Sequence, residues 1–260
     1  MKSGAIQIQT IAIIGAQGAM GRFFQERFQN RGYDPAALDR HSTREDLCRL
    51  VRRSDLVILA VPIRAMEAVL SSLQDILAPE TVLVDLCSVK VRPLDLMLKL
   101  HSGPVVGLHP LFGPDPDCGQ SLRVALVPGR GAEAVKAVKE LLEGIDLCPF
   151  ETSAAEHDRA LALIQGLNFV STISYLSAVS ENKGLEKFLT PSFGRRLHSA
   201  RKMLTQDSEL FQALFEANPY SQEAVRTLRS YLNLAAAGEL DLLKTKACWW
   251  FYEENQGGGA

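Results

Sequence analysis

The feature that most restricts the fold is a glycine-rich loop that joins a strand-like segment to a helix-like segment near the N-terminus. A short apolar run, residues 11–14, leads directly into it, and residues 21–31 then follow the pattern of a helix. The loop has the form Gly-x-x-Gly-x-x-Gly, a variant of the Gly-x-Gly-x-x-Gly fingerprint of dinucleotide-binding domains. We expect its backbone and the helix N-terminus to bind the phosphates of a dinucleotide. The residues of the loop are Gly15, Ala16, Gln17, Gly18, Ala19, Met20 and Gly21.

The first half of the chain alternates strand-like and helix-like segments. The later strand-like segments are residues 36–38, 56–61, 82–86, 105–108 and 124–127. Continuous apolar strands separated by helices are typical of a parallel sheet that is covered on both faces. We therefore expect residues 1–150 to form a doubly wound α/β domain of the Rossmann type, which binds the dinucleotide.

The pattern changes near residue 151. Ser153 and Glu156 form the capping-box sequence Ser-x-x-Glu, and a long helical pattern follows to about Ser180. The later helical patterns occupy residues 208–211, 223–234 and 240–252. We expect residues 151–260 to form an all-helical domain. An aromatic cluster near the C-terminus suits either an interface with a partner subunit or ordinary core packing. It consists of Trp249, Trp250, Phe251 and Tyr252.

The composition is that of an ordinary globular protein. Of the 260 residues, 47% are apolar and 22% are charged, and the formal net charge of -2 indicates no binding to nucleic acid. No apolar run reaches the ~18 residues of a membrane span, and the N-terminal apolar run is too short and glycine-rich for a signal sequence. The five cysteines form no Cys-x-x-Cys pair. We therefore expect a cytoplasmic protein with no disulfide framework and no metal site.

The second predicted strand supplies a candidate for cofactor choice, because Asp39 follows it directly. A carboxylate here accepts hydrogen bonds from the adenosine ribose of NAD and repels the 2′-phosphate of NADP. Arg40 and His41 come next and either could meet that phosphate, so NADP is the alternative to the NAD that we expect. The third strand ends in a segment that we expect to line the nicotinamide side of the crevice. Its residues are Ala60, Val61, Pro62 and Ile63.

Two further strand ends lead toward the same crevice, and they carry Ser88 and His109. Oxidation of an alcohol needs a base, since the hydroxyl loses its proton as hydride leaves, and histidine titrates near neutrality. We expect His109 to be this base and Ser88 to orient the imidazole or the substrate hydroxyl. A histidine that caps a strand is the structural alternative. Cys87 has no evident activating group beside it, which argues against a nucleophile.

Six sequence blocks occur in order along the chain. They are the glycine loop, AVPI at 60–63, DLCSVK at 85–90, GLHPLFGP at 107–114, EHD at 156–158 and QDSELF at 206–211. Together they resemble prephenate dehydrogenase, the TyrA family, over about residues 10 to 215. The DLCSVK and HPLFGP blocks are specific to this resemblance, whereas the glycine loop is not. We expect His157, in the EHD block, to have a structural role at the start of the long helix.

The resemblance implies a Rossmann domain followed by a helical dimerisation domain, and hence a homodimer. It also implies the oxidative decarboxylation of prephenate to 4-hydroxyphenylpyruvate in tyrosine biosynthesis, with NAD taking the hydride. His109 would accept the proton of the ring C4 hydroxyl, and Ser88 would orient that hydroxyl. Carbon dioxide leaves because the product ring becomes aromatic. No helical module precedes residue 10, so we expect no fused chorismate mutase.

The chain departs from the family at the positions that would contact the substrate, which is a dianion. Family members usually have an arginine where this chain has Lys202, and lysine lacks the bidentate fork of arginine. Many members have a histidine where this chain has Phe169. The other candidates for substrate contacts are Gln165, Asn168, Arg196 and Arg201. These departures leave arogenate and 4-amino-4-deoxyprephenate as alternative substrates.

Two other functions compete with this interpretation. One is a different oxidoreductase of the 6-phosphogluconate-dehydrogenase type, such as a β-hydroxyacid dehydrogenase with a lysine base. Lys183 and Lys202 lack the glycine-flanked setting that such a base would need. The other is a non-catalytic regulator that senses NAD. The presence of Ser88 together with His109 argues against a regulator.

Overall fold

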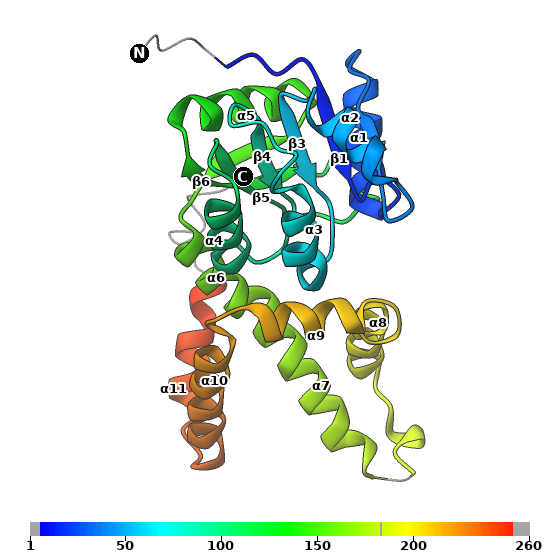
Figure 1. The fold of residues 1–260 in the computed structure, drawn as a ribbon. Helices are drawn as coiled ribbons and strands as arrows, with labels where there is room; N and C mark the ends of the chain where they lie inside the picture. Colours follow the sequence, from blue (N-terminus) through cyan, green and yellow to red (C-terminus); the bar gives the residue numbers. More distant parts are fainter. Residues whose placement is uncertain (1–5, 183, 252–260) are drawn as a thin grey trace. The chain divides into compact units, whose positions relative to one another are not determined.

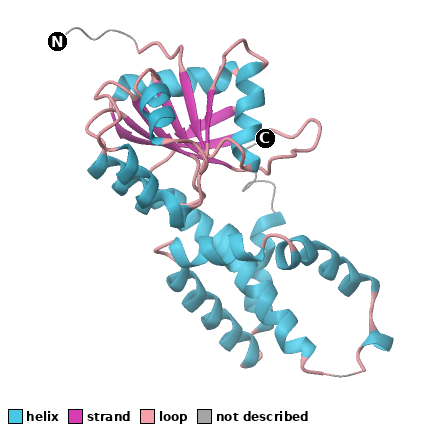
Figure 2. Ribbon diagram, turned by 45° about the vertical axis from the view of Figure 1, so that its right-hand side comes forward, coloured by secondary structure: helices cyan, strands magenta, loops and turns pink. Residues whose placement is uncertain are grey.

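The computed structural model describes residues 6–182 and 184–251 (Figure 1). The chain divides into two compact units, Met1–Leu161 and Ala162–Ala260. Unit 1 combines a sheet with helices, and the described part of unit 2 is helical (Figure 2). Lys183 and Tyr252, both named above as candidates, lie outside the described residues.

Unit 1 is built on a seven-stranded sheet with the order β2-β1-β3-β4-β5-β6-β7. Its strands are β1 (Ile11–Ile14), β2 (Ala36–Leu38), β3 (Leu56–Leu59), β4 (Val82–Asp85), β5 (Val105–Pro110), β6 (Arg123–Arg130) and β7 (Cys148–Glu151). The first five strands pair in parallel. The strand order reverses next to β1, which is where a doubly wound fold opens its ligand crevice. The predicted fold class is therefore confirmed.

Helices cover both faces of this sheet. They are α1 (Ala19–Gln29), α2 (Arg44–Val51), α3 (Met66–Leu73), which is preceded by a 3-10 turn η1 (Ile63–Ala65), α4 (Val91–Leu100) and α5 (Ala132–Gly144). A further helix, α6 (Ala154–Leu161), packs against α4. Strand side chains alternate between two cores: Ile13 belongs to the core under α1 and α5, whereas Ile14 belongs to the core under α2, α3 and α4. Both faces are thus apolar, which explains why the strands appear as unbroken apolar runs in the sequence.

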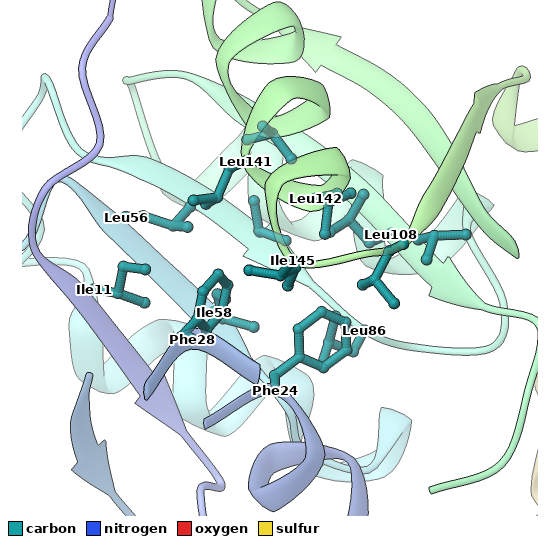
Figure 3. Packing of buried hydrophobic residues seen from close by; sticks show 14 of the residues in the cluster. Ile11, Phe24, Phe28, Leu56, Ile58, Leu86, Leu108, Leu141, Leu142 and Ile145 are labelled. Atoms are coloured by element: carbon teal, nitrogen blue, oxygen red, sulfur yellow. The ribbon is translucent and has the colours of Figure 1, made fainter. Parts of the chain in front are cut away.

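Large side chains from α1 and α5 fill the first core (Figure 3). Phe24 and Phe28 of α1 are fully buried there, with ring centroids 6.2 Å apart. Burying one such side chain stabilises the fold by roughly 1.5–3 kcal/mol. This packing holds α1, and with it the glycine loop, against the end of β1.

The expectation of an all-parallel sheet is wrong for β6 and β7. β6 pairs antiparallel with β5, and β7 pairs in parallel with β6 after the crossover through α5. A loop without a helix, residues 111–122, joins β5 to β6. Parallel neighbours need a long crossover, whereas a loop suffices for antiparallel ones. β7 is missing from the sequence prediction because this edge strand is partly exposed and has no apolar run.

The sequence predicts a domain boundary after residue 150, whereas the units divide after Leu161. The difference is α6, which the contacts assign to unit 1. Its Asp158 side chain accepts hydrogen bonds from the backbone N–H groups of Lys90, at 2.7 Å, and Val91, at 2.9 Å. These two groups form the start of α4, so a side chain from the predicted helical domain caps a helix of the predicted dinucleotide-binding domain.

The long helix predicted from Ser153 to about Ser180 is present as a continuous helix, Ala154–Ser180. Ser153 Oγ accepts a hydrogen bond from the Glu156 N–H, as the capping box predicts, while the Glu156 carboxylate accepts one from Thr152 Oγ1. A π-helical turn interrupts the α-helical geometry directly after α6. The helices from this turn onward are η2 (Ala162–Gly166), α7 (Leu167–Ser180), η3 (Glu186–Phe188), α8 (Pro191–Thr205), α9 (Ser208–Ala217), α10 (Ser221–Ala236), α11 (Leu240–Ala247) and η4 (Cys248–Phe251).

Unit 2 therefore contains the predicted later helices as α9, α10 and α11, and it adds α8. The α8 helix begins at Pro191, with the Thr190 side chain as its cap. Phe169 of α7 is buried and stacks on Phe211 of α9, with ring centroids 5.8 Å apart. Phe169 thus packs two helices of this unit together.

The helix Ala154–Ser180 has the length and apolar composition that a membrane span needs, so the expectation that no segment does is wrong in this respect. Scattered polar residues interrupt the apolar run in the sequence, but they do not lower the mean hydropathy of the segment below that of a membrane span. Core helices of soluble proteins meet the same criterion. The first turns of this helix contain His157 and Asp158, which are buried in unit 1.

Candidate active site

The glycine loop follows β1 and leads into α1, as the sequence predicts. Gly15 has φ +89°, and a Cβ atom there would lie 2.3 Å from the carbonyl oxygen of Ala60. A Cβ atom on Gly21 would lie 2.2 Å from the carbonyl oxygen of Gly15. No other residue fits either position, since Gly15 forms the turn against β3 and Gly21 brings α1 against the loop.

The N-terminus of α1 is free to bind an anion. Gly18 is its N-cap, with no side-chain hydrogen bond to the helix, and the first turn contains no acidic residue. The first backbone N–H groups of a helix have no intrahelical acceptor. A cradle of glycine backbone beside such N–H groups fits a pyrophosphate.

A cavity of about 700 Å³ opens beside this loop in unit 1. Eight of the predicted cofactor-binding residues line it: Gly15, Gln17, Gly18, Asp39, Arg40, Ala60, Val61 and Pro62. The other predicted residues do not line it. Ala16 is buried, Met20 and Ile63 pack against the two cores, Ala19 is exposed at the first turn of α1, and Gly21 contacts the loop backbone. The cavity has the size of a small-molecule site.

Asp39 lies at the rim of this cavity, directly after β2. Its Oδ1 atom accepts a hydrogen bond from the His41 N–H at 2.7 Å, and its own N–H donates to Ser42 Oγ at 2.9 Å. The carboxylate therefore stabilises its own turn and still has a second oxygen to offer a ribose hydroxyl. The neighbouring Arg40 is exposed, and its Nε lies 3.2 Å from His41 Nε2.

The ends of β4 and β5 are tied together by a buried ion pair. Lys90 Nζ donates to Asp85 Oδ2 at 2.5 Å and to the carbonyl oxygen of Leu108 at 2.6 Å, and neither charged side chain is exposed to solvent. The carbonyl of Leu108 directly precedes His109. Sequence reasoning gave Asp85 and Lys90 no role, although a carboxylate at the end of an apolar strand signals a buried charge that needs a partner.

Cys87 lies in the same loop and is buried. Its Sγ atom is 3.7 Å from the carbonyl oxygen of Val61. Burial raises the pKa of the Cys87 thiol, and the nearby Asp85 carboxylate raises it further. A thiol in this state is a poor nucleophile, in agreement with the expectation from the sequence. Among the described residues, no group of three or more His, Cys, Asp or Glu side chains could hold a metal ion.

His109 lies near the end of β5 and contacts a second histidine. Its Nδ1 atom is 2.9 Å from Nε2 of His157, which is in α6, and Nδ1 of His157 is 2.8 Å from Asp158 Oδ1. The two rings are nearly perpendicular, at 75°. His109 and His157 are 4% and 3% exposed, and Asp158 is fully buried. Three side chains thus form one buried hydrogen-bonded chain that sequence reasoning did not assemble, although the EHD block contains two of them.

The environment of His109 keeps its imidazole neutral. Burial lowers the pKa of His109 well below its ordinary value, and His157 and the Lys90 ammonium lower it further. Two fully buried side-chain N or O atoms of the described residues lack a hydrogen bond, Asp85 Oδ1 and Ser221 Oγ. Nε2 of His109 is not one of them and has no partner among the described residues, so it is open to solvent. A neutral imidazole with one accessible nitrogen is equipped to accept a proton.

Ser88 is half-buried in the loop between β4 and α4. β4 and β5 are parallel neighbours, with Asp85 opposite Gly107. Ser88 therefore follows the end of β4 at the same edge of the sheet at which β5 carries His109. The parallel pairing thus confirms that the two strand ends meet at one edge, as the sequence predicts.

The predicted substrate contacts outside unit 1 are spread over unit 2. Gln165 is half-buried in the π-helical turn, and Asn168 is exposed at the start of α7. The three cations, Arg196, Arg201 and Lys202, are exposed on α8. Arg196 lies 3.9 Å from the ring centroid of Tyr175 and lines one hollow, whereas Arg201 lines another. Unit 2 by itself does not gather these side chains into one site.

Comparison with known proteins agrees with this geometry. Residues 31–147 match the family described as "Prephenate dehydrogenase, nucleotide-binding domain". The chain is 34% identical to "T-protein" of Enterobacter agglomerans over 79% of this chain and 56% of that protein. It is 30% identical to "T-protein" of Haemophilus influenzae over 85% of this chain and 60% of that protein. The chain thus spans little more than half the length of these curated relatives.

The fold is also that of a solved enzyme. The crystal structure of prephenate dehydrogenase from A. aeolicus in complex with hydroxyphenyl propionate and NAD+ superposes with a TM-score of 0.75 at 18% identity, covering 97% of this chain and 95% of that chain. The sequence blocks, the glycine cradle and the family match over the dinucleotide-binding region all point to one group of proteins. The chain belongs to the prephenate dehydrogenase family.

Proposed function

We propose that this chain is an NAD-dependent prephenate dehydrogenase that produces 4-hydroxyphenylpyruvate in tyrosine biosynthesis. The observation that carries the proposal is His109, a neutral buried imidazole with an accessible Nε2 atom at the carboxyl edge of the sheet that also carries the glycine cradle. Membership of the prephenate dehydrogenase family supports the same reaction. A β-hydroxyacid dehydrogenase with a lysine base lacks comparable support, since Lys202 is exposed on α8.

The cofactor site fits a dinucleotide. Gly15, Gly18 and Gly21 leave backbone where side chains would otherwise stand, and the N-terminus of α1 favours the pyrophosphate. Asp39 would accept a hydrogen bond from the adenosine ribose, which favours NAD over NADP. NAD, when bound, supplies the hydride acceptor. Ala60, Val61 and Pro62, which follow β3, form another part of the cavity wall.

Residues of unit 1 then bind the proton that the substrate hydroxyl loses. His109 Nε2 accepts the proton of the C4 hydroxyl as hydride leaves that carbon, so the C–H bond breaks while the carbonyl forms. Ser88 holds the hydroxyl or the imidazole in place. The ring carboxylate departs as carbon dioxide, and the electrons of the broken C–C bond complete an aromatic ring. The protein therefore needs to assist only the oxidation.

The carboxylates of the substrate need cations and donors. Arg196, Arg201 and Lys202 are proposed to pair with them, with Gln165 and Asn168 as further donors. Phe169 cannot make the polar contact of the family's histidine, because it is buried against Phe211. Prephenate is the proposed substrate. The alternatives are 4-amino-4-deoxyprephenate, which differs from prephenate at C4, and arogenate, which differs at the side chain.

The described residues of unit 2 expose many large apolar side chains, which supports a homodimer. Phe188, Leu232, Leu240 and Phe251 are 69%, 60%, 62% and 81% exposed in the single chain. Large apolar side chains left exposed in a single chain are often covered by a partner. We propose that unit 2 pairs with the same unit of a second copy. The free thiols of all five cysteines fit the cytoplasm as the location.

The test is the appearance of reduced nicotinamide with prephenate and NAD, measured for the wild type, His109→Asn and His101→Asn. His101 is a second buried histidine, bonded to the carbonyl oxygen of Thr81 and given no part in the reaction, so its variant controls for lost stability. We expect turnover in the wild type and in His101→Asn, and a loss of about 10²–10⁴-fold in His109→Asn. Unchanged turnover in His109→Asn would remove the proposed base. Binding of NAD without turnover of any of the three substrates would support a regulator instead.

A further inference from the structure

We infer that His157 and Asp158 are positioning residues that fix the tautomer of His109, so that its accessible Nε2 atom carries the lone pair. The inference deepens the proposed function, because it concerns the base named there. It rests on the chain of side-chain contacts that runs from Asp158 through His157 to His109.

The hydrogen bonds that link these three side chains have a defined donor-to-acceptor direction at Asp158. Its Oδ1 atom accepts the Lys90 N–H at 2.7 Å, and Oδ2 accepts the Val91 N–H at 2.9 Å. These backbone groups can only donate, so they hold the carboxylate in one orientation as an acceptor. The 2.8 Å contact from Asp158 Oδ1 to His157 Nδ1 is therefore a hydrogen bond that the imidazole donates.

The position of the proton on His157 then determines the position of the proton on His109. A neutral His157 with its proton on Nδ1 presents a lone pair at Nε2. The 2.9 Å contact between His157 Nε2 and His109 Nδ1 must then be donated by His109. A neutral His109 with its proton on Nδ1 has a lone pair on Nε2, which is the nitrogen open to solvent. No other arrangement of two neutral rings satisfies both contacts.

Burial stabilises this arrangement of protons and hydrogen bonds. His157 and Asp158 are almost completely shielded from solvent, so water does not compete for their hydrogen bonds. The orientation of Asp158 is set by the start of α4, which follows the loop of Ser88 and Lys90. The same helix start that shapes this loop therefore also orients the histidine chain. In proteases with a Ser-His-Asp triad, an aspartate fixes a histidine tautomer in the same way, and its replacement by asparagine leaves the wrong tautomer.

The direct test is a ¹⁵N NMR spectrum of the histidine side chains in the full chain at about pH 8, where a histidine with an ordinary pKa is neutral. We expect His109 to carry its proton on Nδ1. His101 provides an internal reference of the opposite kind, because its Nε2 atom lies 2.8 Å from the carbonyl oxygen of Thr81, which can only accept. The His109→Asn and His101→Asn variants assign the two signals. A proton on Nε2 of His109, or an average of both tautomers, would overturn the inference.

A pair of substitutions separates positioning from mere support of the fold. His157→Leu removes the acceptor for His109 Nδ1, whereas His157→Gln offers an amide oxygen in its place. We expect His157→Leu to lower kcat by about 10²-fold or more with the Kd for NAD unchanged, and His157→Gln to restore part of the loss. His101→Leu is the matched control, since it removes an equally buried ring from unit 1. Equal kcat losses in His157→Leu and His101→Leu, or an equal loss in His157→Gln, would contradict a positioning role.

Failure of the tautomer inference can be distinguished from failure of the proposed function. The NMR result needs neither substrate nor turnover, so it stands or falls even if no substrate is oxidised. An inactive wild type with His109 protonated on Nδ1 would overturn the proposed function alone. An active wild type with His109 protonated on Nε2 would overturn the tautomer inference alone.

Discussion

The ammonium of Lys90 lies 2.5 Å from Oδ2 of Asp85, and neither side chain reaches solvent. Asp85 ends β4, and Lys90 is the residue before α4, so the ion pair closes the loop that carries Ser88. The second partner of the ammonium, the carbonyl oxygen of Leu108, extends the contact to β5. The geometry of the proposed base and of its neighbouring loop therefore depends on one buried charge pair.

Removing one partner of this pair should cost stability. Lys90→Met leaves the Asp85 carboxylate buried without its cation, and such changes typically cost about 3–5 kcal/mol. Denaturation by urea, followed by circular dichroism, measures the change in the free energy of unfolding. Lys99→Met is the matched control, because Lys99 forms a solvent-exposed pair with Asp95, which is worth at most about 1 kcal/mol. A loss in Lys90→Met no larger than in the control would show that the buried pair does not hold the fold.

Adding one methyl group to the glycine loop should disturb cofactor binding. The Cβ atom of Gly21→Ala would lie 2.2 Å from the carbonyl oxygen of Gly15, so α1 must move away from the loop. Overpacking of this kind costs about 1–3 kcal/mol, and we expect the affinity for NAD to fall together with stability. Calorimetric titration with NAD measures the affinity. Gly144→Ala, where a Cβ atom meets nothing within 4 Å, should leave both quantities intact.

The charge of Asp39 should decide between the two nicotinamide cofactors. Asp39→Asn keeps an oxygen for the His41 N–H and removes the negative charge that would face the 2′-phosphate of NADP. We expect kcat/KM for NADP to rise relative to that for NAD by about tenfold, or ~1.4 kcal/mol. Steady-state assays with both cofactors give the ratio. Adding Arg40→Gln to this variant should abolish the gain, and a ratio that does not move in Asp39→Asn would argue against contact with the ribose.

Two buried histidines should make stability depend on pH. Burial is the main cause of the lowered pKa of both His109 and His101. Between the lowered pKa and the ordinary value of about 6.5, the unfolded chain binds protons that the folded chain does not. The contribution of these two histidines to the free energy of unfolding should therefore be complete above about pH 6.5 and be lost as the pH decreases below it. Urea denaturation at several pH values measures the slope, which should be shallower in His109→Asn and in His101→Asn. The same slope in the wild type and both variants would contradict this assignment.

A charge placed on the exposed apolar surface of unit 2 should weaken self-association. Leu232 of α10 is 60% exposed in the single chain, and Leu232→Lys would bury a charge in any interface that covers it. We expect the dissociation constant of the homodimer to rise by about tenfold or more, as for a side chain near the centre of an interface. Sedimentation equilibrium measures it. Leu111→Lys makes the same change on unit 1 and serves as the control. A wild type that sediments as a monomer at micromolar concentration would remove the dimer proposal.

Much of unit 1 was predictable from local sequence, because local sterics and side-chain periodicity act over a few residues. The glycine loop, the parallel strands β1 to β5, the long helix and its Ser153 cap all follow from such short-range patterns. The family blocks also led to the loop of Ser88 and to the β5 end at His109. Each of these features is specified by residues that are neighbours in the chain.

The tertiary structure alone decided which distant side chains meet. His109 and His157 are 48 positions apart, and their contact depends on α6 packing against α4 within unit 1, which extends to Leu161. The direction of β6 likewise depends on how a loop returns the chain to β5. Periodicity reports which face of an element is apolar, but not which element covers it. The sequence by itself thus determined the dinucleotide-binding architecture and the candidate base, whereas the path of the chain in space determined which residues orient that base.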